Sequence, residues 1–413
     1  MARRFFAAPL SLALLGALLA GCASGMVVTG GVPAKGFAAG GGPGSAPTDA
    51  VYLPRPSAEG APAVGNSAAG LVASDAYAPE KGQGQSGLKG GELDDNAQFG
   101  RYLDYLASYQ APDVRRMEVS NRFVVRVVDA AGKSVPDASL TVLAGTSPVA
   151  TLKSGSDGRA LVFAPAGAAT GDLAVQVRKG EMALESTLAD RSATLALPGS
   201  RGAVPQTLDI AFVLDVTGSM GDELARIQQT TGDISARIKS LPAGSLAVRY
   251  GLVAYRDRND DFVTRTHDFT QDLPAFKERL AALAAVGGGD YPEAVQEALH
   301  AAINKLSWTE TDSVRLMFVV GDAPPHLDYA QDFPYPEQLR KAAAAGIKIF
   351  PIAASGLDNQ GEYVFRQFAQ YTGGKFLYIT YGGDTPHHVG PVQENNLDDL
   401  VVGIVKTELA NLE

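Results

Sequence analysis

The sequence predicts a doubly wound α/β domain over residues 205–413, preceded by a small all-β sandwich over residues 119–199 and a disordered linker. Three observations lead to this prediction. Strands alternate with helices after Pro205, short strands alternate with turn residues before it, and residues 23–90 consist largely of small residues and proline. The 413 residues allow about two to three domains at ~150 residues each.

Composition excludes several functional classes. A formal net charge of −10, with no basic cluster beyond the first residues, argues against nucleic-acid binding. A single cysteine excludes an intrachain disulfide and a cysteine zinc cluster. Five scattered histidines argue against a histidine-rich metal site.

Residues 1–21 have the pattern of a secretory signal peptide. Two arginines precede an apolar run from Phe5 to Ala20, which is shorter than the ~20 residues of a membrane-spanning helix. The ending Leu19-Ala20-Gly21-Cys22 resembles the lipobox of bacterial lipoproteins, in which the Cys22 sulfur would receive a diacylglycerol and palmitate-type acyl chains would complete the anchor. Ala23 after the cysteine then implies the outer membrane, on its periplasmic or its surface side. The alternative is an ordinary cleaved signal with an incidental cysteine.

Residues 22–90 are expected to be a disordered tether. Of the 68 residues 23–90, 42 are Gly, Ala, Ser or Pro, which leaves too little apolar surface to offset chain entropy. Residues 91–118 form a connector with a short helix over 97–109, because Phe99, Tyr102, Leu103 and Leu106 recur at helical spacing.

Residues 119–199 alternate like strands, at 122–128, 139–143 and 159–163, with turns such as Ser156-Asp157-Gly158 between them. Such spacing predicts a small antiparallel sandwich. The pattern Asp129-x-x-Gly132-x-x-Val135 resembles carboxypeptidase regulatory-like and prealbumin-like modules, and it indicates no ligand.

After Pro205 the expected strands are 208–214, 247–255, 262–269 at an edge, 314–320, 347–353 and 375–380. The expected helices are a first one that carries Met220 to Leu241 on one face, then 272–285, 292–306, 335–345, 360–371 and 395–412. This alternation predicts a mostly parallel sheet covered by helices on both faces, with the functional site at the carboxyl ends of its strands.

Three strand–helix junctions carry oxygen ligands. Asp215, Thr217 and Ser219 follow the first strand, Asp290 lies in the run Gly287–Glu293, and Asp322 follows another strand. Carboxylates and hydroxyls are hard ligands suited to Mg²⁺ or Ca²⁺. Each piece alone could be a helix cap or a turn, but their order along the chain favours one metal site.

This set resembles the von Willebrand factor type A (VWA) domain and its metal-ion-dependent adhesion site, over about residues 205–413. The resemblance implies a Rossmann-like α/β fold and no catalysis. It implies a metal, usually Mg²⁺ with Mn²⁺ or Ca²⁺ as alternatives, held by Asp215, Thr217, Ser219 and Asp322. The metal shell would be completed by an acidic residue of a protein partner.

Asp290 departs from the family pattern, because many members carry Thr there. Three aspartates around a divalent ion leave a net charge of −1, which disfavours an incoming carboxylate. Either the metal is then tightly held and mainly structural, or Asp290 stays behind a water molecule.

Several other polar residues have two interpretations. His326 either lines the site or is a satisfied loop histidine, and the run 256–261 is either a partner-contact loop or a solvated turn. His387 and His388 are expected to be a surface pair.

The predicted function is that of a lipid-anchored envelope protein that binds a protein partner through a divalent cation, without enzymatic activity. One alternative is a haloacid-dehalogenase-type phosphotransferase, because Asp215-x-Thr217-Gly218-Ser219 also resembles the nucleophile loop of those enzymes. Another is a structural envelope component with an inert metal.

Overall fold

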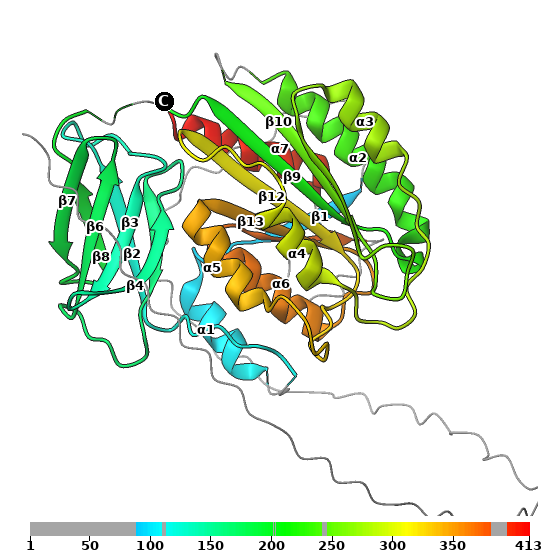
Figure 1. Ribbon diagram of the computed structural model, residues 1–413, viewed down its shortest axis with the longest axis horizontal. Helices are drawn as coiled ribbons and strands as arrows, with labels where there is room; N and C mark the ends of the chain where they lie inside the picture. The colour runs from blue at the N-terminus through cyan, green and yellow to red at the C-terminus, as the bar shows by residue number, and fades with distance from the viewer. Residues whose placement is uncertain (1–87, 110–112, 201, 203, 242–245, 381–394) are drawn as a thin grey trace, which may run out of the picture. The chain divides into compact units, whose positions relative to one another are not determined.

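The computed structural model describes residues 88–109, 113–200, 202, 204–241, 246–380 and 395–413 (Figure 1). The predicted signal peptide, Cys22, most of the predicted tether, His387 and His388 lie outside the described residues. Within the described ranges, none of the helices has the length and apolar character that crossing a bilayer requires.

The larger sheet is mixed and has eight strands among the described residues. In sheet order the strands are β11 (Thr264–Thr270), β10 (Ala247–Tyr255), β9 (Thr207–Asp215), β12 (Ser313–Gly321), β13 (Ile347–Ala353), β14 (Phe376–Thr380), β1 (Lys89–Leu93) and β15 (Asn395–Asn396). The five adjacent strands from β10 to β14 in this order run parallel, whereas β11, β1 and β15 pair antiparallel with their neighbours.

Helices cover both faces of this sheet, as the alternating pattern predicts (Figure 1). One face packs against α2 (Gly221–Lys239), α3 (Leu273–Ala281) and α7 (Leu397–Ala410). The other packs against α1 (Phe99–Ser108), α4 (Val295–Asn304), α5 (Tyr335–Ala345) and α6 (Asn359–Thr372). Every residue of β12 is buried, which is typical of a central strand covered on both faces. A mixed sheet flanked by helices fits the expected Rossmann-like α/β class.

The predicted boundary between tether and connector, at residue 90, is wrong because it falls inside strand β1. Residues 89–90 are predicted to belong to the tether, and no strand is predicted in the connector, but Lys89–Leu93 pairs antiparallel with β14. A Cβ at Gly90 would lie 2.6 Å from the Tyr378 carbonyl oxygen, and one at Gly91 would collide with the Tyr378 ring. These glycines permit the close approach of the two strands, and they also remove the alternating apolar side chains by which a strand is predicted.

Residues 122–196 form two smaller sheets around one apolar core. One contains β5 (Arg159–Phe163), β2 (Arg122–Val128) and β8 (Ser192–Ala196), and the other contains β4 (Ser147–Lys153), β3 (Ser139–Ala144), β6 (Leu173–Lys179) and β7 (Met182–Thr187). The predicted pairing is wholly antiparallel, but β2 and β8 are parallel. The chain passes through the other sheet before it returns as β8, so no hairpin imposes the antiparallel direction.

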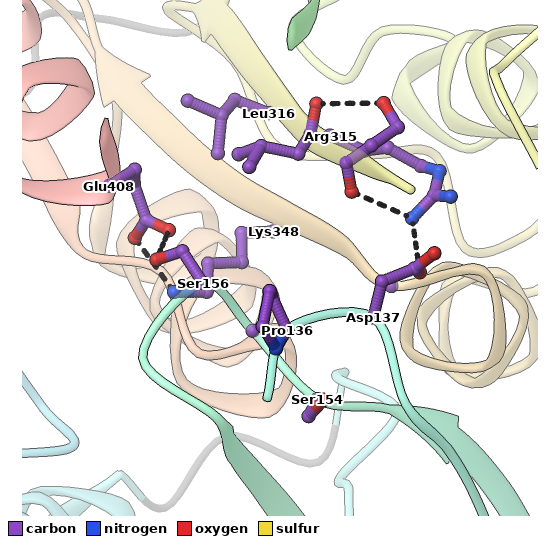
Figure 2. Close-up of a pocket in the computed structure, with 12 residues that line it drawn as sticks. Pro136, Asp137, Ser154, Ser156, Arg315, Leu316, Lys348 and Glu408 are labelled. Carbon is purple, nitrogen blue, oxygen red and sulfur yellow. Dashed lines mark hydrogen bonds and ion pairs between the residues drawn. The ribbon is translucent and has the colours of Figure 1, made fainter. Parts of the chain in front are cut away.

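Polar contacts line a small cavity beside the start of β12 (Figure 2). The Arg315 guanidinium lies 2.9 Å from an Asp137 carboxylate oxygen, and both side chains are almost fully buried. Asp137 also accepts a hydrogen bond from the Asp312 backbone N–H at 2.7 Å. Glu408 pairs with Lys348 and accepts a hydrogen bond from the Ser156 hydroxyl, each at 2.7 Å.

Candidate metal centre

The first and the third of the three predicted junctions meet at the carboxyl end of the parallel sheet. Asp215 is the last residue of β9, and Asp322 directly follows β12, the parallel neighbour of β9. Thr217 follows Asp215 by two residues, and Ser219 lies in the short 3-10 turn Gly218–Met220 that leads into α2. The topology therefore brings these four predicted ligands to the same edge.

Hydrogen bonds organise the first loop. The backbone N–H and the hydroxyl of Thr217 both donate to Asp215 Oδ1, at 2.9 and 2.7 Å. The Thr217 and Ser219 hydroxyl oxygens lie 3.0 Å apart, within hydrogen-bond distance. The nearby Ser219 hydroxyl partly offsets the raised pKa of Asp322, so this loop lies next to the loop after β12.

Without a bound cation, the ionised forms of Asp215 and Asp322 are unfavourable in the folded chain. Burial, followed by the nearby Asp322 charge, raises the pKa of Asp215 to about 7. Burial also raises the pKa of Asp322. Asp215 is fully buried and Asp322 is 6% exposed. A positive ion between them would remove this penalty.

Glu293 is a third buried carboxylate, which belongs to the predicted run Gly287–Glu293 but is not among the predicted metal ligands. It is 2% exposed. Burial raises its pKa to about 9, with Asp215 as the strongest of the charges that add to the effect. Its backbone N–H donates to the Pro324 carbonyl, so it is anchored to the loop that carries Asp322.

The triple glycine allows the chain to pass close to these groups. Gly287 and Gly288 have φ angles of 88° and 76°, in the left-handed region that favours glycine. A Cβ at Gly288 would lie 2.9 Å from Glu293 Oε1 and 3.2 Å from Thr217 Cβ. The Gly287 carbonyl accepts a hydrogen bond from the Gly218 N–H at 2.9 Å, which joins the first and second loops.

Asp290 is brought next to His326 and Asp257. His326 Nε2 lies 3.6 Å from an Asp290 carboxylate oxygen and 3.7 Å from one of Asp257. The ligand atoms of these three residues all lie within 4.8 Å of one another. The predicted role of Asp290 beside the metal of Asp215 stays a prediction.

The run 256–261 is not a solvated turn throughout. Arg256 and Asp257 are 7% and 2% exposed. Asp260 Oδ2 accepts hydrogen bonds from the Gly288 N–H at 2.9 Å and from the Asp257 N–H at 3.1 Å. The high charge of this run favours a solvated turn, but two of its charged side chains are buried and Asp260 bonds to the glycine loop.

The buried oxygens fit a hard divalent cation. Asp215 Oδ2, Asp322 Oδ1 and Glu293 Oε2 are buried and accept no hydrogen bond among the described residues. Buried carboxylate oxygens normally have donors, so acceptors left without one at a shared edge suit a metal ion. Asp215, Thr217, Ser219 and Asp322 are the residues that would hold it.

Comparison with known proteins agrees with this geometry. Residues 209–380 match the family model of the von Willebrand factor A domain. This part of the chain is a VWA domain. Such domains are generally interaction modules rather than enzymes, and they often bind a divalent metal.

Three relatives are similar mainly over parts of the chain. A von Willebrand factor A domain-containing protein 7 of Rattus norvegicus is 33% identical over 161 residues, which cover 37% of this chain and 16% of that protein. A putative ariadne-like RING finger protein of Acanthamoeba polyphaga mimivirus is 27% identical over 189 residues, covering 42% and 18%. Vitrin of Bos taurus is 28% identical over 254 residues, covering 58% and 36%. The chain therefore spans well under half the length of each of these relatives.

Proposed function

We propose that this chain is a lipid-anchored bacterial envelope protein whose VWA domain binds a protein partner in a divalent-cation-dependent manner. One observation carries the metal part of the proposal. Two buried carboxylate oxygens, Asp215 Oδ2 and Asp322 Oδ1, lie at the same sheet edge and have no hydrogen-bond donor in the part of the chain that the structure describes. Mg²⁺ is the expected ion, because the candidate ligands are all oxygens.

The four candidate ligands would contribute different oxygens to the bound ion. Asp215 and Asp322 supply the negative charge, while the hydroxyls of Thr217 and Ser219 supply neutral oxygen ligands. When bound, the ion offers a remaining coordination position to an acidic side chain of the partner. We keep Asp290 outside this ligand set, because its carboxylate lies against His326 and Asp257.

The enzymatic alternative has less support. A phosphotransferase would require Asp215 to attack a phosphorus atom, but that carboxylate is fully buried. The match of residues 209–380 to the VWA family also favours an interaction module. A structural envelope role with an inert metal differs from our proposal only in lacking a cation-dependent partner.

Calorimetric titration of Mg²⁺ into the full chain, purified metal-free in detergent, tests the metal site. We expect saturable binding that is lost in Asp215→Asn, because the substitution removes one of the two charged ligands. Asp233→Asn, on the exposed side of α2, is the matched control and should bind normally. Equal binding by Asp215→Asn would exclude this site as the place where Mg²⁺ binds.

The anchor is a separate part of the proposal and has its own test. The lipobox at Leu19–Cys22 supports acylation of Cys22 and an outer-membrane location. In cells fed an alkyne-bearing fatty acid, we expect the wild-type chain to take up the label and Cys22→Ser to lose it. Equal labelling of both chains would contradict lipidation at Cys22.

A further inference from the structure

We propose that Asp257, Asp290 and His326 form a second divalent-cation site, suited to a transition ion of the Zn²⁺ type. This site is distinct from the Mg²⁺ site assigned to Asp215 and Asp322, and it shares no ligand with it. The inference does not depend on the proposed function.

The spacing of the three side chains fits a common ion. The Nε2 atom of His326 lies 3.6 Å from Asp290 Oδ2 and 3.7 Å from Asp257 Oδ2. Ligand atoms about 2.0–2.2 Å from a tetrahedral zinc ion lie roughly 3.3–3.6 Å from one another. All three ligand atoms lie within 4.8 Å of one another, so an inward movement of the exposed Asp290 side chain would bring them to coordination distances.

The histidine nitrogen that faces the two carboxylates is buried. His326 is 5% exposed, and its Nε2 has no hydrogen-bond partner among the residues that the structure describes. Its other nitrogen, Nδ1, lies 2.8 Å from a carboxylate oxygen of Asp328. Because an ionised carboxylate can only accept, Nδ1 carries the proton in this contact, which leaves Nε2 as the nitrogen that can offer a lone pair to a metal. Metal-binding histidines commonly have this arrangement, in which a second carboxylate orients the ring.

Tyr329 holds two of the proposed ligands in place. Its ring stacks on the His326 imidazole with a centroid distance of 4.0 Å, and its hydroxyl donates to both Asp257 oxygens, at 2.7 and 2.9 Å. The Arg258 guanidinium lies over the Tyr329 ring and donates to Glu297 at 2.8 Å, so a carboxylate outside the cluster partners its charge. The ligands are therefore oriented by packing and hydrogen bonds before an ion binds.

The donor set determines the class of ion. Two carboxylates and one imidazole neutralise a divalent charge, and the imidazole favours Zn²⁺ and similar transition ions over Mg²⁺ or Ca²⁺. The Asp290 side chain is 61% exposed, whereas those of Asp257 and His326 are 3% and 5% exposed. The site therefore opens to solvent on the Asp290 side, where a fourth ligand from water or another molecule can bind.

Titration of Zn²⁺ into the metal-free full chain, with Co²⁺ absorption as a geometric probe, tests the proposal. We expect Asp290→Asn to weaken Zn²⁺ binding by about tenfold or more and His326→Gln to abolish the Co²⁺ absorption band. Asp290→Asn changes an exposed side chain, so it should fold normally even if His326→Gln does not. His300→Gln, which removes a histidine on α4, is the matched control and should leave both signals unchanged.

Asp215→Asn separates the two proposed sites. Because it supplies no ligand to the second site, we expect its Zn²⁺ affinity and Co²⁺ band to match the wild type. Zn²⁺ binding that is unchanged in folded Asp290→Asn and His326→Gln would overturn the proposal. A Co²⁺ band that disappears in Asp215→Asn alone would also overturn it, because the ion would then occupy the first site.

Discussion

The carboxylates of Glu293 and Asp215 destabilise the metal-free fold when ionised, but they favour binding of a divalent cation. Both are buried, and burial followed by neighbouring negative charge raises their pKa values to about 9 and about 7. Without a cation, the folded chain therefore favours their protonated forms. A bound divalent ion reverses this preference, so the same residues that weaken the metal-free fold give the site its affinity.

The pH dependence of stability follows from these raised pKa values. The unfolded carboxyls titrate near their ordinary values of about 4, so the metal-free folded chain holds extra protons above that pH. The stabilisation from these protonated groups is complete below pH ~4, and it is lost as pH rises through about 7 for Asp215 and about 9 for Glu293. We predict that urea unfolding in chelator shows lower stability at pH 9 than at pH 5.

Glu293→Gln isolates this effect from the other titrating groups. The amide keeps the shape of the side chain but cannot ionise, so the decline in stability between pH 5 and pH 9 should be smaller than in the wild type. Saturating Mg²⁺ should also reduce the decline, because it stabilises the ionised carboxylates. Identical pH profiles for wild type and Glu293→Gln in chelator would show that Glu293 is not protonated in the fold.

At the scale of elements, hydrophobic periodicity was sufficient for most of the α/β domain. The predicted strand 247–255 and helix 335–345 coincide with β10 and α5, because long apolar patterns fix both the element and its buried face. The apolar pattern does not reveal β1, because Gly90 and Gly91 carry no side chains to form it. These glycines are needed for the close approach to Tyr378. The apolar pattern also gives no strand direction, which is why the parallel pairing of β2 with β8 was not predicted.

The candidate site was predictable to a similar degree. The strand ends identify Asp215 and Asp322 because parallel topology brings such ends together. Sequence spacing could not show that Asp257 is buried next to His326 or that Glu293 is buried near Asp215. Those positions depend on long-range packing of three loops. A triple glycine followed by two acidic residues, Asp290 and Glu293, was the one available signal of close backbone approach.

At the scale of the whole molecule, the chain combines an acidic composition with a VWA domain that matches its relatives over only a fraction of their length. A net charge of −10 would slow the approach of an acidic partner unless a cation creates a local attraction. The proposed Mg²⁺ at Asp215 and Asp322 supplies that attraction. Partner binding should therefore require the ion itself, and not only the fold that the ion stabilises.

The most direct test of this central claim is quantitative capture of envelope proteins on the immobilised full chain, with Mg²⁺ or with chelator. Wild type, Asp322→Asn and the control Asp233→Asn are compared at a temperature where all remain folded. We predict a protein retained by wild type and Asp233→Asn only in Mg²⁺, and not by Asp322→Asn in either condition. A partner retained equally in chelator, or equally by Asp322→Asn in Mg²⁺, would contradict cation-dependent binding through this site.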